Sequence, residues 1–375
     1  MRFPKFSGEW TKTLLNNYLE ENKERNKRGI FTKNHVLSVS GDFGIVNQIE
    51  LLGRSFAGKS VLDYHVVRTG NIVYTKSPLK EYPYGIVKVN GGVDGIVSTL
   101  YAVYKVKETA NGKFVEYYFG LPNRTNRYFK PIVRIGAKHD MKIGNDEVLA
   151  NYVVFPCVDE QKRISDFICL LDERIATQIK IIEDLKKLKS AISNEIFEQT
   201  SNRICELNEI ASVIMGQSPS SHAYNNNAEG LPLIQGNLDI ENGQLSPRIY
   251  TSEITQTCEC GDVILTVRAP VGEIAIAQQE ACIGRGVCSI RPHVKNDTNL
   301  IYQFLQYFTP KWGSLEQGST FTAVSGTDIR GIAVSIPSAD KIELLNVYDN
   351  KIKVESRILA NLIQQKQYLL AQMFI

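Results

Sequence analysis

Two long stretches of the chain place apolar residues at helical spacing and contain neither glycine nor proline. One runs from Asp159 to about Gln199, and the other from Asp340 to Phe374. Their apolar residues fall on a and d positions of a heptad, which makes one narrow seam on each helix. Because a helix with a single apolar seam has to bury it, the pattern predicts two long helices that pack on a partner.

The second stretch repeats the first. Shifted by 177 residues, 172–197 aligns with 349–374 without a gap. The polar breaks in the seam coincide as well, because Gln178 and Glu355 share a d position and Lys189 and Lys366 share an a position. The predicted coiled-coil seam consists of Ile175, Ile182, Leu185 and Ile192 in the first helix and Ile352, Leu359, Leu362 and Leu369 in the second.

The segments before the helices are also repeated. Each helix follows an apolar stretch that ends in proline, and further upstream each half has a turn and a strand with a basic residue near its end, at 69–77 and 260–270. A repeat of this size indicates duplication of a whole domain. The predicted layout is a globular domain at 1–156, a central helix at 157–200, a globular domain at 201–338 and a C-terminal helix at 339–375.

This layout predicts an α+β fold. Two globular domains are related by pseudo-two-fold symmetry and separated by the two long helices, which form an antiparallel coiled coil. The plainer alternative is that each helix packs only on its own domain. About 40 residues at 1.5 Å per residue make a rod of roughly 60 Å. An antiparallel pair would therefore hold two similar domains apart, as a two-fold pair of readers on DNA half-sites requires.

Charge is distributed unevenly between the two domains. The net charge is only +3, but residues 1–156 hold 23 Lys/Arg and 14 Asp/Glu, a balance of +9. Residues 201–338 hold 8 Lys/Arg and 13 Asp/Glu, a balance of −5. The first domain can therefore attract a polyanion by charge alone, whereas the second needs local clustering or a basic partner.

The composition of the chain indicates its cellular compartment. The 375 residues, 43% of them hydrophobic, suffice for two or three domain cores. Residues 1–10 lack the apolar centre of a signal peptide, and no apolar run approaches the roughly 18 residues of a membrane span. The seven cysteines are scattered without a disulfide-type spacing. We therefore expect a protein of the reducing cytoplasm.

Residues 53–60, GRSFAGKS, fit the phosphate-binding loop pattern G-x-x-x-x-G-K-[ST]. Such a loop needs a buried strand before it and a helix that begins at its lysine. The preceding segment instead mixes polar and apolar residues, and the following one predicts strand, turn and strand around Thr69-Gly70. Such a loop is often accompanied by an acidic residue at the end of a strand. Asp172, the candidate for that residue, lies instead in the heptad helix. A nucleotide hydrolase is therefore the least favoured function.

No metal site or catalytic set is predicted. Cys258, Cys260, Cys282 and Cys288 lie close in sequence, but their C-x-C and C-x5-C spacings are not those typical of zinc sites. Cys288 is expected on the buried face of a strand. The five histidines are scattered singly, and no common catalytic motif is present.

Several motifs recur in order along the chain. The first half holds FPKFSGEW (3–10), VLSVSGDFGIVNQ (36–48) and RIGAKHDMKI (134–143), and the second half holds GQSPSSHAYN (216–225), GDVILTVRAPVGEIA (261–275) and GSTFTAVSGTDIRGIAVSIP (318–337). Together with the duplicated helices, they resemble the specificity (S) subunit of a type I restriction-modification system over nearly the whole chain. Lys138 stands where this family often has arginine, and the tryptophan expected near 203–211 is missing.

The resemblance implies a mechanism. Each globular domain would be a target recognition domain that reads one half of a split double-stranded DNA site. The helix pair would set the distance between the two halves. The helices would dock two modification (methyltransferase) subunits, which bring S-adenosylmethionine. A restriction (translocase/nuclease) subunit would add ATP and Mg²⁺. The chain itself would be non-catalytic and would carry no cofactor.

DNA contacts need particular side chains. Lysine and arginine suit phosphates, arginine also suits guanine, and asparagine or glutamine suits adenine. The candidates are Arg54, Lys59, Lys76, Lys88, Arg134 and Lys138 in the first domain, and Gln217, Ser218, Gln235, Arg268, Ser319 and Thr320 in the second.

The runner-up function is a two-domain interaction or scaffold protein that uses the same coiled-coil spacer without DNA. The first domain's positive balance argues against it, and the second domain's negative balance argues weakly for it. A scaffold would show no steep dependence of DNA affinity on salt.

Overall fold

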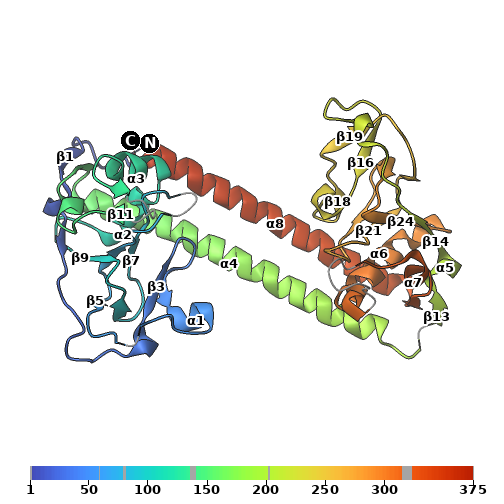
Figure 1. Cartoon of the computed structure of the whole chain (residues 1–375), viewed down its shortest axis with the longest axis horizontal. Coiled ribbons are helices and arrows are strands. Elements are labelled where there is room, and N and C mark those ends of the chain that lie inside the picture. Colours follow the sequence, from blue (N-terminus) through green and yellow to red (C-terminus); the bar gives the residue numbers. More distant parts are fainter. Residues whose placement is uncertain are drawn as a thin grey trace. The chain divides into compact units, whose positions relative to one another are not determined.

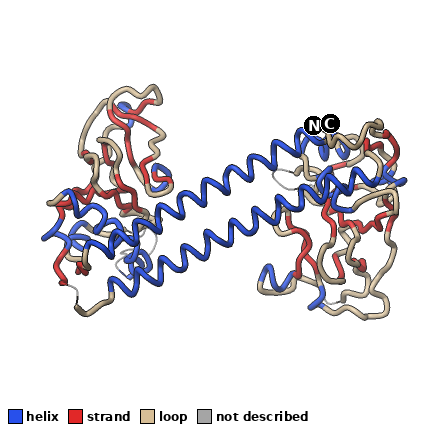
Figure 2. The backbone as a smooth tube through the Cα atoms, turned by 180° about the vertical axis from the view of Figure 1, so that it is seen from behind, coloured by secondary structure: helices blue, strands red, loops and turns tan. Residues whose placement is uncertain are grey.

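The computed structural model describes residues 2–58, 60–78, 82–135, 141–201, 203–314 and 323–374. Its contacts divide the chain into two compact units (Figure 1). Unit 1 comprises Met1–Thr177 and Leu359–Ile375, and unit 2 comprises Gln178–Ile358. Each unit therefore combines a strand-rich globular part with a segment of both long helices (Figure 2).

The centre of unit 1 is a four-stranded antiparallel sheet in the order β2-β9-β6-β7. Its strands are β2 (Leu19–Glu21), β6 (Ile72–Tyr74), β7 (Val87–Val89) and β9 (Ala102–Val106). Four antiparallel pairs surround it: β1 (Thr11–Leu14) with β12 (Tyr152–Phe155), β3 (Leu37–Ser40) with β4 (Gly44–Asn47), β5 (His65–Val67) with β8 (Gly95–Val97), and β10 (Arg134–Ile135) with β11 (Met141–Lys142).

Short helices complete unit 1, and side chains or proline define where they begin. They are α1 (Gln48–Leu52), α2 (Gly112–Phe119) and α3 (Pro122–Phe129), with 3₁₀ helices η1 (Leu15–Asn17), η2 (Lys33–His35) and η3 (Glu147–Leu149). The Asn111 side chain accepts from the Phe114 amide at the start of α2, and Pro122 opens α3. Helices α2 and α3 contribute Phe114 and Phe129 to an aromatic core.

Unit 2 has a six-stranded sheet in the order β14-β24-β21-β22-β18-β17, a five-stranded sheet in the order β15-β19-β16-β23-β20, and the pair β13-β25. The pairs β18-β22 and β16-β23 are parallel, and the others are antiparallel. The strands are β13 (Arg203–Glu206), β14 (Ala211–Met215), β15 (Tyr224–Asn225), β16 (Leu231–Ile234), β17 (Ile240–Glu241), β18 (Gln244–Leu245), β19 (Ile249–Thr251), β20 (Thr257–Cys258), β21 (Val263–Thr266), β22 (Ile274–Ile276), β23 (Ala281–Ile283), β24 (Val287–Pro292) and β25 (Ala333–Ile336).

Helix α6 (Thr298–Phe308) packs on the larger sheet of unit 2 and supplies Ile301, Phe304 and Leu305 to its core. The remaining short helices are α5 (Leu207–Ile210) and α7 (Gly326–Arg330), with 3₁₀ helices η4 (Ser221–Ala223), η5 (Asn237–Asp239), η6 (Lys295–Asp297) and η7 (Thr309–Ser314). Cys288 is fully buried in β24, as the strand pattern predicts, and burial raises the pKa of its thiol to about 12.

The two units share a strand framework. The order β2-β9-β6-β7 corresponds to β14-β24-β21-β22, β5-β8 to β20-β23, and β1-β12 to β13-β25. The predicted repeat of a turn followed by a strand is confirmed, although the basic residues Lys76 and Arg268 lie one position apart in the common register. Gly70 and Gly261 both have positive φ, and the next residue, Asn71 or Asp262, donates its amide to a carbonyl three residues earlier at 3.0 and 3.1 Å. In this common register Thr75 matches Thr266, and each threonine hydroxyl accepts the backbone amide of the residue just before the neighbouring strand, β7 or β22.

The two predicted long helices are α4 (Val158–Phe197) and α8 (Ala339–Met373). Within unit 1, Asp172 of α4 pairs with Lys366 of α8 at 2.5 Å. Within unit 2, Gln178 donates to the Glu355 carboxylate at 2.6 Å and Lys189 pairs with Asp349 at 2.6 Å. Positions that rise along α4 meet positions that fall along α8, so the segments pack antiparallel in each unit. All eight predicted seam residues are buried or half-buried.

The helix ends also enter the globular cores. Ile164 and Ile168 of α4, with Phe374 just beyond α8, lie in the core of unit 1, and Phe374 stacks on Phe114 with 5.1 Å between ring centroids. Phe197 of α4 lies in the core of unit 2. Each helix therefore packs both on the other helix and on globular cores, which combines the two arrangements that the sequence allows.

The segment that contains GRSFAGKS does not form a phosphate-binding loop in its described part. Helix α1, not a buried strand, precedes it, and Gly53 ends that helix with a φ of 73°. Residues 60–78 hold β5, the turn at 69–71 and β6, as the sequence predicts, rather than a helix. Lys59 lies outside the described residues. Among the described helices, none is both long and apolar enough to cross a membrane.

Candidate DNA interface

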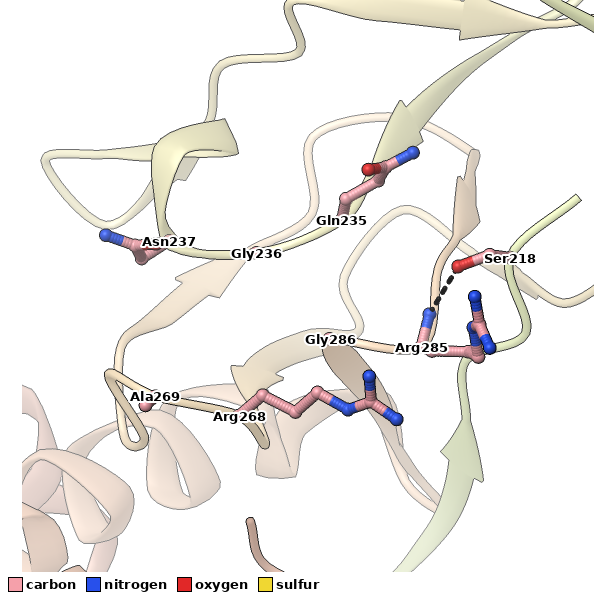
Figure 3. Close-up of a pocket in the computed structure, with 8 residues that line it drawn as sticks. All are labelled: Ser218, Gln235, Gly236, Asn237, Arg268, Ala269, Arg285 and Gly286. Atoms are coloured by element: carbon pink, nitrogen blue, oxygen red, sulfur yellow. Dashed lines mark hydrogen bonds between the residues drawn. The ribbon is translucent and has the colours of Figure 1, made fainter. Parts of the chain in front are cut away.

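Three of the predicted DNA-contact residues of the second domain line one polar pocket of about 330 Å³ within unit 2 (Figure 3). They are Ser218, Gln235 and Arg268, which come from segments far apart in the sequence. The sequence analysis missed a fourth side chain, Arg285, which lines the same pocket. The other lining residues are Gly236, Asn237, Ala269 and Gly286.

Strand pairing brings these residues together. The parallel pair β16-β23 places Gln235, just after β16, beside Gly284, just after β23. The antiparallel pair β21-β24 places Arg268, two residues after β21, near Gly286, just before β24. The backbones are linked by hydrogen bonds from the Gly284 amide to the Ile234 carbonyl (2.8 Å) and from the Val267 amide to the Gly286 carbonyl (2.9 Å). The pocket is thus built at strand ends of two sheets.

Glycines permit these strand ends to approach closely. A Cβ at Gly286 would lie 2.0 Å from the Gln235 carbonyl oxygen, and one at Gly216 would lie 2.1 Å from the Gly284 carbonyl oxygen. Both distances are far below van der Waals contact, so no larger residue fits without moving the backbone. The floor of the pocket is therefore a closely packed backbone surface with little freedom to shift.

Arg285 sits at the tip of a tight turn. The Val287 amide donates to the Gly284 carbonyl at 3.1 Å, and the Arg285 amide donates to the Ser218 hydroxyl at 3.0 Å. Ser218 is thus already engaged in fixing the turn. Figure 3 shows the Arg268 and Arg285 side chains on the same side of the pocket, with Gln235 on the opposite wall.

Neither pocket guanidinium has a counter-ion in the described part of the chain. Two other arginines of unit 2 are neutralised: Arg248 pairs with Asp239 at 2.9 Å, and Arg291 pairs with Asp262 at 3.0 Å. No such ion pair involves Arg268 or Arg285 among residues 203–314 and 323–374. The pocket therefore concentrates positive charge in a domain whose overall balance is negative, which is the local clustering that DNA binding would require.

The other candidates of the second domain are less informative. Gln217 is exposed next to the pocket residue Ser218, and its backbone amide donates to the Ile283 carbonyl at 2.9 Å. Ser319 and Thr320 lie outside the described residues. The signal that could have revealed Arg285 is the tripeptide Gly284-Arg285-Gly286 between two short apolar runs, which indicates an exposed arginine in a tight turn.

In unit 1, two candidate lysines have partners inside the fold. Lys76 is half-buried and donates to the Ile143 carbonyl at 2.9 Å and to the Asn145 side chain, and burial lowers its pKa. Lys88 pairs with Glu116 at 3.4 Å, and its side chain is 20% exposed. These contacts support structural roles for both lysines, although neither contact tests DNA binding.

The other candidates of the first domain do not gather in one pocket. Arg54 is exposed, with its guanidinium 4.6 Å from the Phe56 ring centroid. Arg134 is exposed on β10. Lys59 and Lys138 lie outside the described residues. No group of these side chains therefore defines a binding surface in the described part of unit 1.

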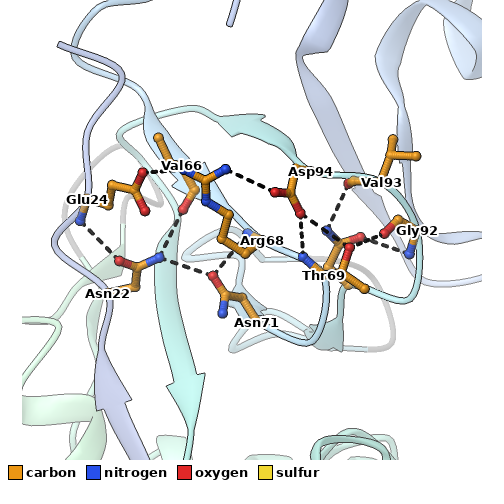
Figure 4. Close-up of polar contacts among 10 residues, drawn as sticks. Asn22, Glu24, Val66, Arg68, Thr69, Asn71, Gly92, Val93 and Asp94 are labelled. Atoms are coloured by element: carbon orange, nitrogen blue, oxygen red, sulfur yellow. Dashed lines mark hydrogen bonds and ion pairs between the residues drawn. The ribbon is translucent and has the colours of Figure 1, made fainter. Parts of the chain in front are cut away.

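A polar network uses another basic residue of unit 1 to hold the repeated turn (Figure 4). Arg68 pairs with Asp94 at 3.0 Å and with Glu24 at 2.6 Å. Asn71 accepts the Arg68 amide at 3.0 Å and an Asn22 amide hydrogen at 3.1 Å. Several positively charged side chains of the first domain are therefore engaged in ion pairs or hydrogen bonds inside the fold.

Comparisons with known proteins agree with the repeated architecture. The family described as type I restriction modification DNA specificity domain matches residues 202–364. A putative type I restriction enzyme MjaX specificity subunit of Methanocaldococcus jannaschii is 30% identical over 229 residues. That match covers 55% of this chain and 54% of the relative, so the chain spans about half the length of the curated relative it matches.

Solved structures extend the likeness to the whole chain. A chain from a structure of the type I R-M system, concerned with complex assembly and conformational transition, has a TM-score of 0.62 and 21% identity, and 98% of each chain is covered. The S subunit of a type I restriction-modification system from M. genitalium has a TM-score of 0.62 and 15% identity, with 98% of this chain and 96% of that one covered. At these identities the likeness concerns the fold. Residues 202–364 therefore match the type I restriction modification DNA specificity domain, and almost the whole chain shares the fold of these two solved structures.

Proposed function

We propose that this chain is the DNA sequence-recognition subunit of a type I restriction-modification complex. Two target recognition domains would each read half of a bipartite DNA site, the first at 1–156 and the second at 201–338. The helices at 157–200 and 339–375 would act as spacers between them. The observation that carries the proposal is the positively charged pocket of unit 2, which lies in the segment matched by the DNA specificity family.

The chain would perform no chemistry itself. Methyltransferase subunits would supply S-adenosylmethionine, and restriction subunits, where present, would supply ATP and Mg²⁺. The complex would work in the cytoplasm, where its DNA lies. This division is consistent with a chain whose candidate site contains guanidinium, carboxamide and hydroxyl groups suited to holding DNA rather than to acid–base catalysis.

Repeated apolar positions on the long helices support the docking of two equivalent subunits. Leu170 of α4 and its repeat equivalent Val347 of α8 are 63% and 54% exposed. Ile181 and its equivalent Ile358 are 40% and 38% exposed. Because the same exposed apolar pair occurs once on each helix, one kind of partner could bind twice.

Methylation mapping tests the recognition function directly. The chain is expressed with its methyltransferase partner in a host without other DNA methylation, and the genome is sequenced by a method that reads modified bases. We expect methylation at a split motif with a fixed gap, and none when the chain is omitted. Methylation that is identical with and without the chain would leave the two-domain scaffold as the better explanation.

Native mass spectrometry of the complex tests the docking surface. Ile181→Ser and Ile358→Ser should each weaken one of two methyltransferase sites by roughly tenfold, since each removes part of one apolar contact. Leu188→Ser is the matched control, because Leu188 is 48% exposed on α4 but its repeat equivalent is the polar Gln365. Loss of binding in the control alone would contradict docking at the repeated positions.

A further inference from the structure

We propose that the Arg268–Arg285 pocket of unit 2 holds one backbone phosphate of the DNA and thereby fixes the register of the second target recognition domain. The inference rests on the proposed DNA-recognition function and assigns a specific task within it. Ser218 and Gln235 would then shape the pocket, and the two guanidinium groups would supply the charge.

The donors of the pocket match a phosphate. Two guanidinium groups lack counter-ions among the described residues, and a phosphate oxygen is a strong acceptor for charge-assisted hydrogen bonds. Gly236 and Gly286 also line the pocket, and no described atom accepts a hydrogen bond from the backbone amide of either residue. Arginine side chains and backbone N–H groups are the usual donors to DNA phosphates.

The shape of the pocket also favours a phosphate over a base edge. Side chains that read base edges project into a groove of the duplex, whereas phosphates are the outermost groups of the DNA. Here the arginines line a concavity of about 330 Å³ whose floor is closely packed glycine backbone. Such a recess receives a group that protrudes from the partner, and the rigid floor sets where that group comes to rest.

The first domain can be compared directly with the second, because it has the same strand framework without arginine at the two pocket positions. In the shared register, the turn at Ser98–Tyr101, closed by the Tyr101 amide on the Ser98 carbonyl at 3.1 Å, corresponds to the turn at Gly284–Val287. Thr99 then takes the place of Arg285, and Ser77 takes the place of Arg268. At these two equivalent positions, arginine is therefore present in the second domain and absent from the first.

The substitutions Arg285→Thr and Arg268→Ser introduce the residues that the first domain uses, so they remove charge with little risk to folding. The test uses the full chain with its methyltransferase partner, and thermal unfolding checks that each variant is folded. Fluorescence anisotropy measures affinity for a duplex with the mapped site and for a duplex with its second half-site scrambled, over a range of salt concentrations. Arg203→Thr, at an exposed arginine of the same unit, is the matched control.

If the pocket holds a phosphate, each variant should lose about tenfold in affinity for both duplexes alike, because a phosphate carries no sequence information. The slope of log affinity against log salt should fall by about 0.9, the value for one phosphate contact. Arg285→Lys should keep most of the affinity, since an ammonium group also binds phosphate. A neutral methylphosphonate at one position of the second half-site should reproduce the loss and add nothing to it in the variants.

Three results would overturn the assignment. A loss confined to the intact site, with no recovery in Arg285→Lys, would mean that the arginine reads a base. Unchanged affinity in both variants would mean that the pocket does not touch DNA. Tight binding of inorganic pyrophosphate to wild type but not to the variants, without an effect on DNA, would assign the pocket to a free phosphate ligand. Failure of the proposed function is a separate outcome, in which the wild-type complex itself binds no DNA.

Discussion

The strand-rich parts of the two units share a framework but differ in where their unpaired basic residues lie. In unit 1, which contains the domain with the +9 balance, Arg68, Lys76 and Lys88 are bound to acceptors inside the fold. In unit 2, whose domain has the −5 balance, Arg268 and Arg285 line a pocket without counter-ions in its described part. The number of positive charges in a domain therefore says less about a DNA contact than whether those charges are already paired.

The difference arises at the strand ends and not in the framework. The turns that contain Gly70 and Gly261 are closed by the same hydrogen bond, and Thr75 and Thr266 accept equivalent amides. The turns before β9 and β24 differ: the first has Ser98, Thr99 and Leu100, and the second has Gly284, Arg285 and Gly286. After the duplication, a conserved scaffold could thus carry a new site by changing a few residues in one turn.

The largest loss of stability is expected when the turn residue after Arg285 is replaced by its equivalent from the first domain. Gly286→Leu introduces the residue found in the first domain, but its Cβ would meet the Gln235 carbonyl at 2.0 Å. We expect a loss of about 3 kcal/mol or more in the stability of unit 2, as for severe overpacking of a rigid site. Hydrogen exchange of the β24 amides measures the loss.

The control for that exchange lies in the other turn. Leu100 is 68% exposed, so Leu100→Ala should change the stability of unit 1 by less than about 0.5 kcal/mol. If Gly286→Leu were tolerated as well as Leu100→Ala, the glycines would not be what holds the pocket floor in place.

The next effect concerns acid sensitivity. His65 of β5 is 1% exposed, and its Nδ1 has no partner among the described residues. Burial lowers the pKa of His65 from 6.5 to about 4, so the unfolded chain takes up a proton before the folded chain does as pH falls. Stability that is fully present above pH 6.5 should therefore decline toward pH 4 by about 3 kcal/mol.

The second unit supplies the control for this pH effect. The strand pair β20-β23 corresponds to β5-β8, and Gln256 takes the place of His65. His65→Gln should remove most of the extra pH dependence of unit 1, measured by denaturant unfolding at pH 7.5, 6 and 4.5. An unchanged pH profile in the variant would show that the carboxylates, which both units contain, account for acid unfolding instead.

Local periodicity explains what the sequence could predict. The two long helices follow from heptads without glycine or proline, and their packing follows from the apolar seam that each must bury. The structure adds that Lys189 and Lys366, the shared polar breaks, each pair with an aspartate of the other helix. The turn at Gly70 was predictable for the same reason, because glycine after threonine between two β-branched runs is a strong local signal. The rejection of GRSFAGKS as a nucleotide site also depended on local pattern.

The candidate site was less predictable because it depends on contacts between distant segments. Ser218, Gln235 and Arg268 were selected by residue type, but only the pairing of β16 with β23 and of β21 with β24 brings them into one pocket. Arg285 has a local signal in Gly284-Arg285-Gly286, but its place in the same pocket as Arg268 depends on that pairing. Lys88 was selected as a lysine suited to phosphate contact, although Glu116, 28 residues later, is its partner. Residue type gives the chemistry of a site, but it does not tell which charges remain unpaired.

The smallest effect compares two ion pairs that the repeat makes equivalent. Lys189 and Asp349 lie in unit 2 with their side chains 10% and 32% exposed, whereas Lys366 and Asp172 lie in unit 1 at 27% and 38%. Lys189→Met should cost about 2 kcal/mol, because it leaves a partly buried carboxylate without its cation. Lys366→Met should cost only about 0.5 kcal/mol, since water screens the more exposed pair.

Denaturant unfolding of each variant at low and high salt separates burial from charge as the cause. High salt should erase the small loss in Lys366→Met and leave most of the loss in Lys189→Met, because buried pairs are screened much less than exposed ones. Asp349 retains a bond from Gln303 at 2.7 Å, and Asp172 retains one from Tyr117 at 2.7 Å, so both variants leave one partner on the aspartate. Equal losses with equal salt dependence would mean that the duplicated pairs still behave alike, and that the divergence of the two units stops at the globular domains.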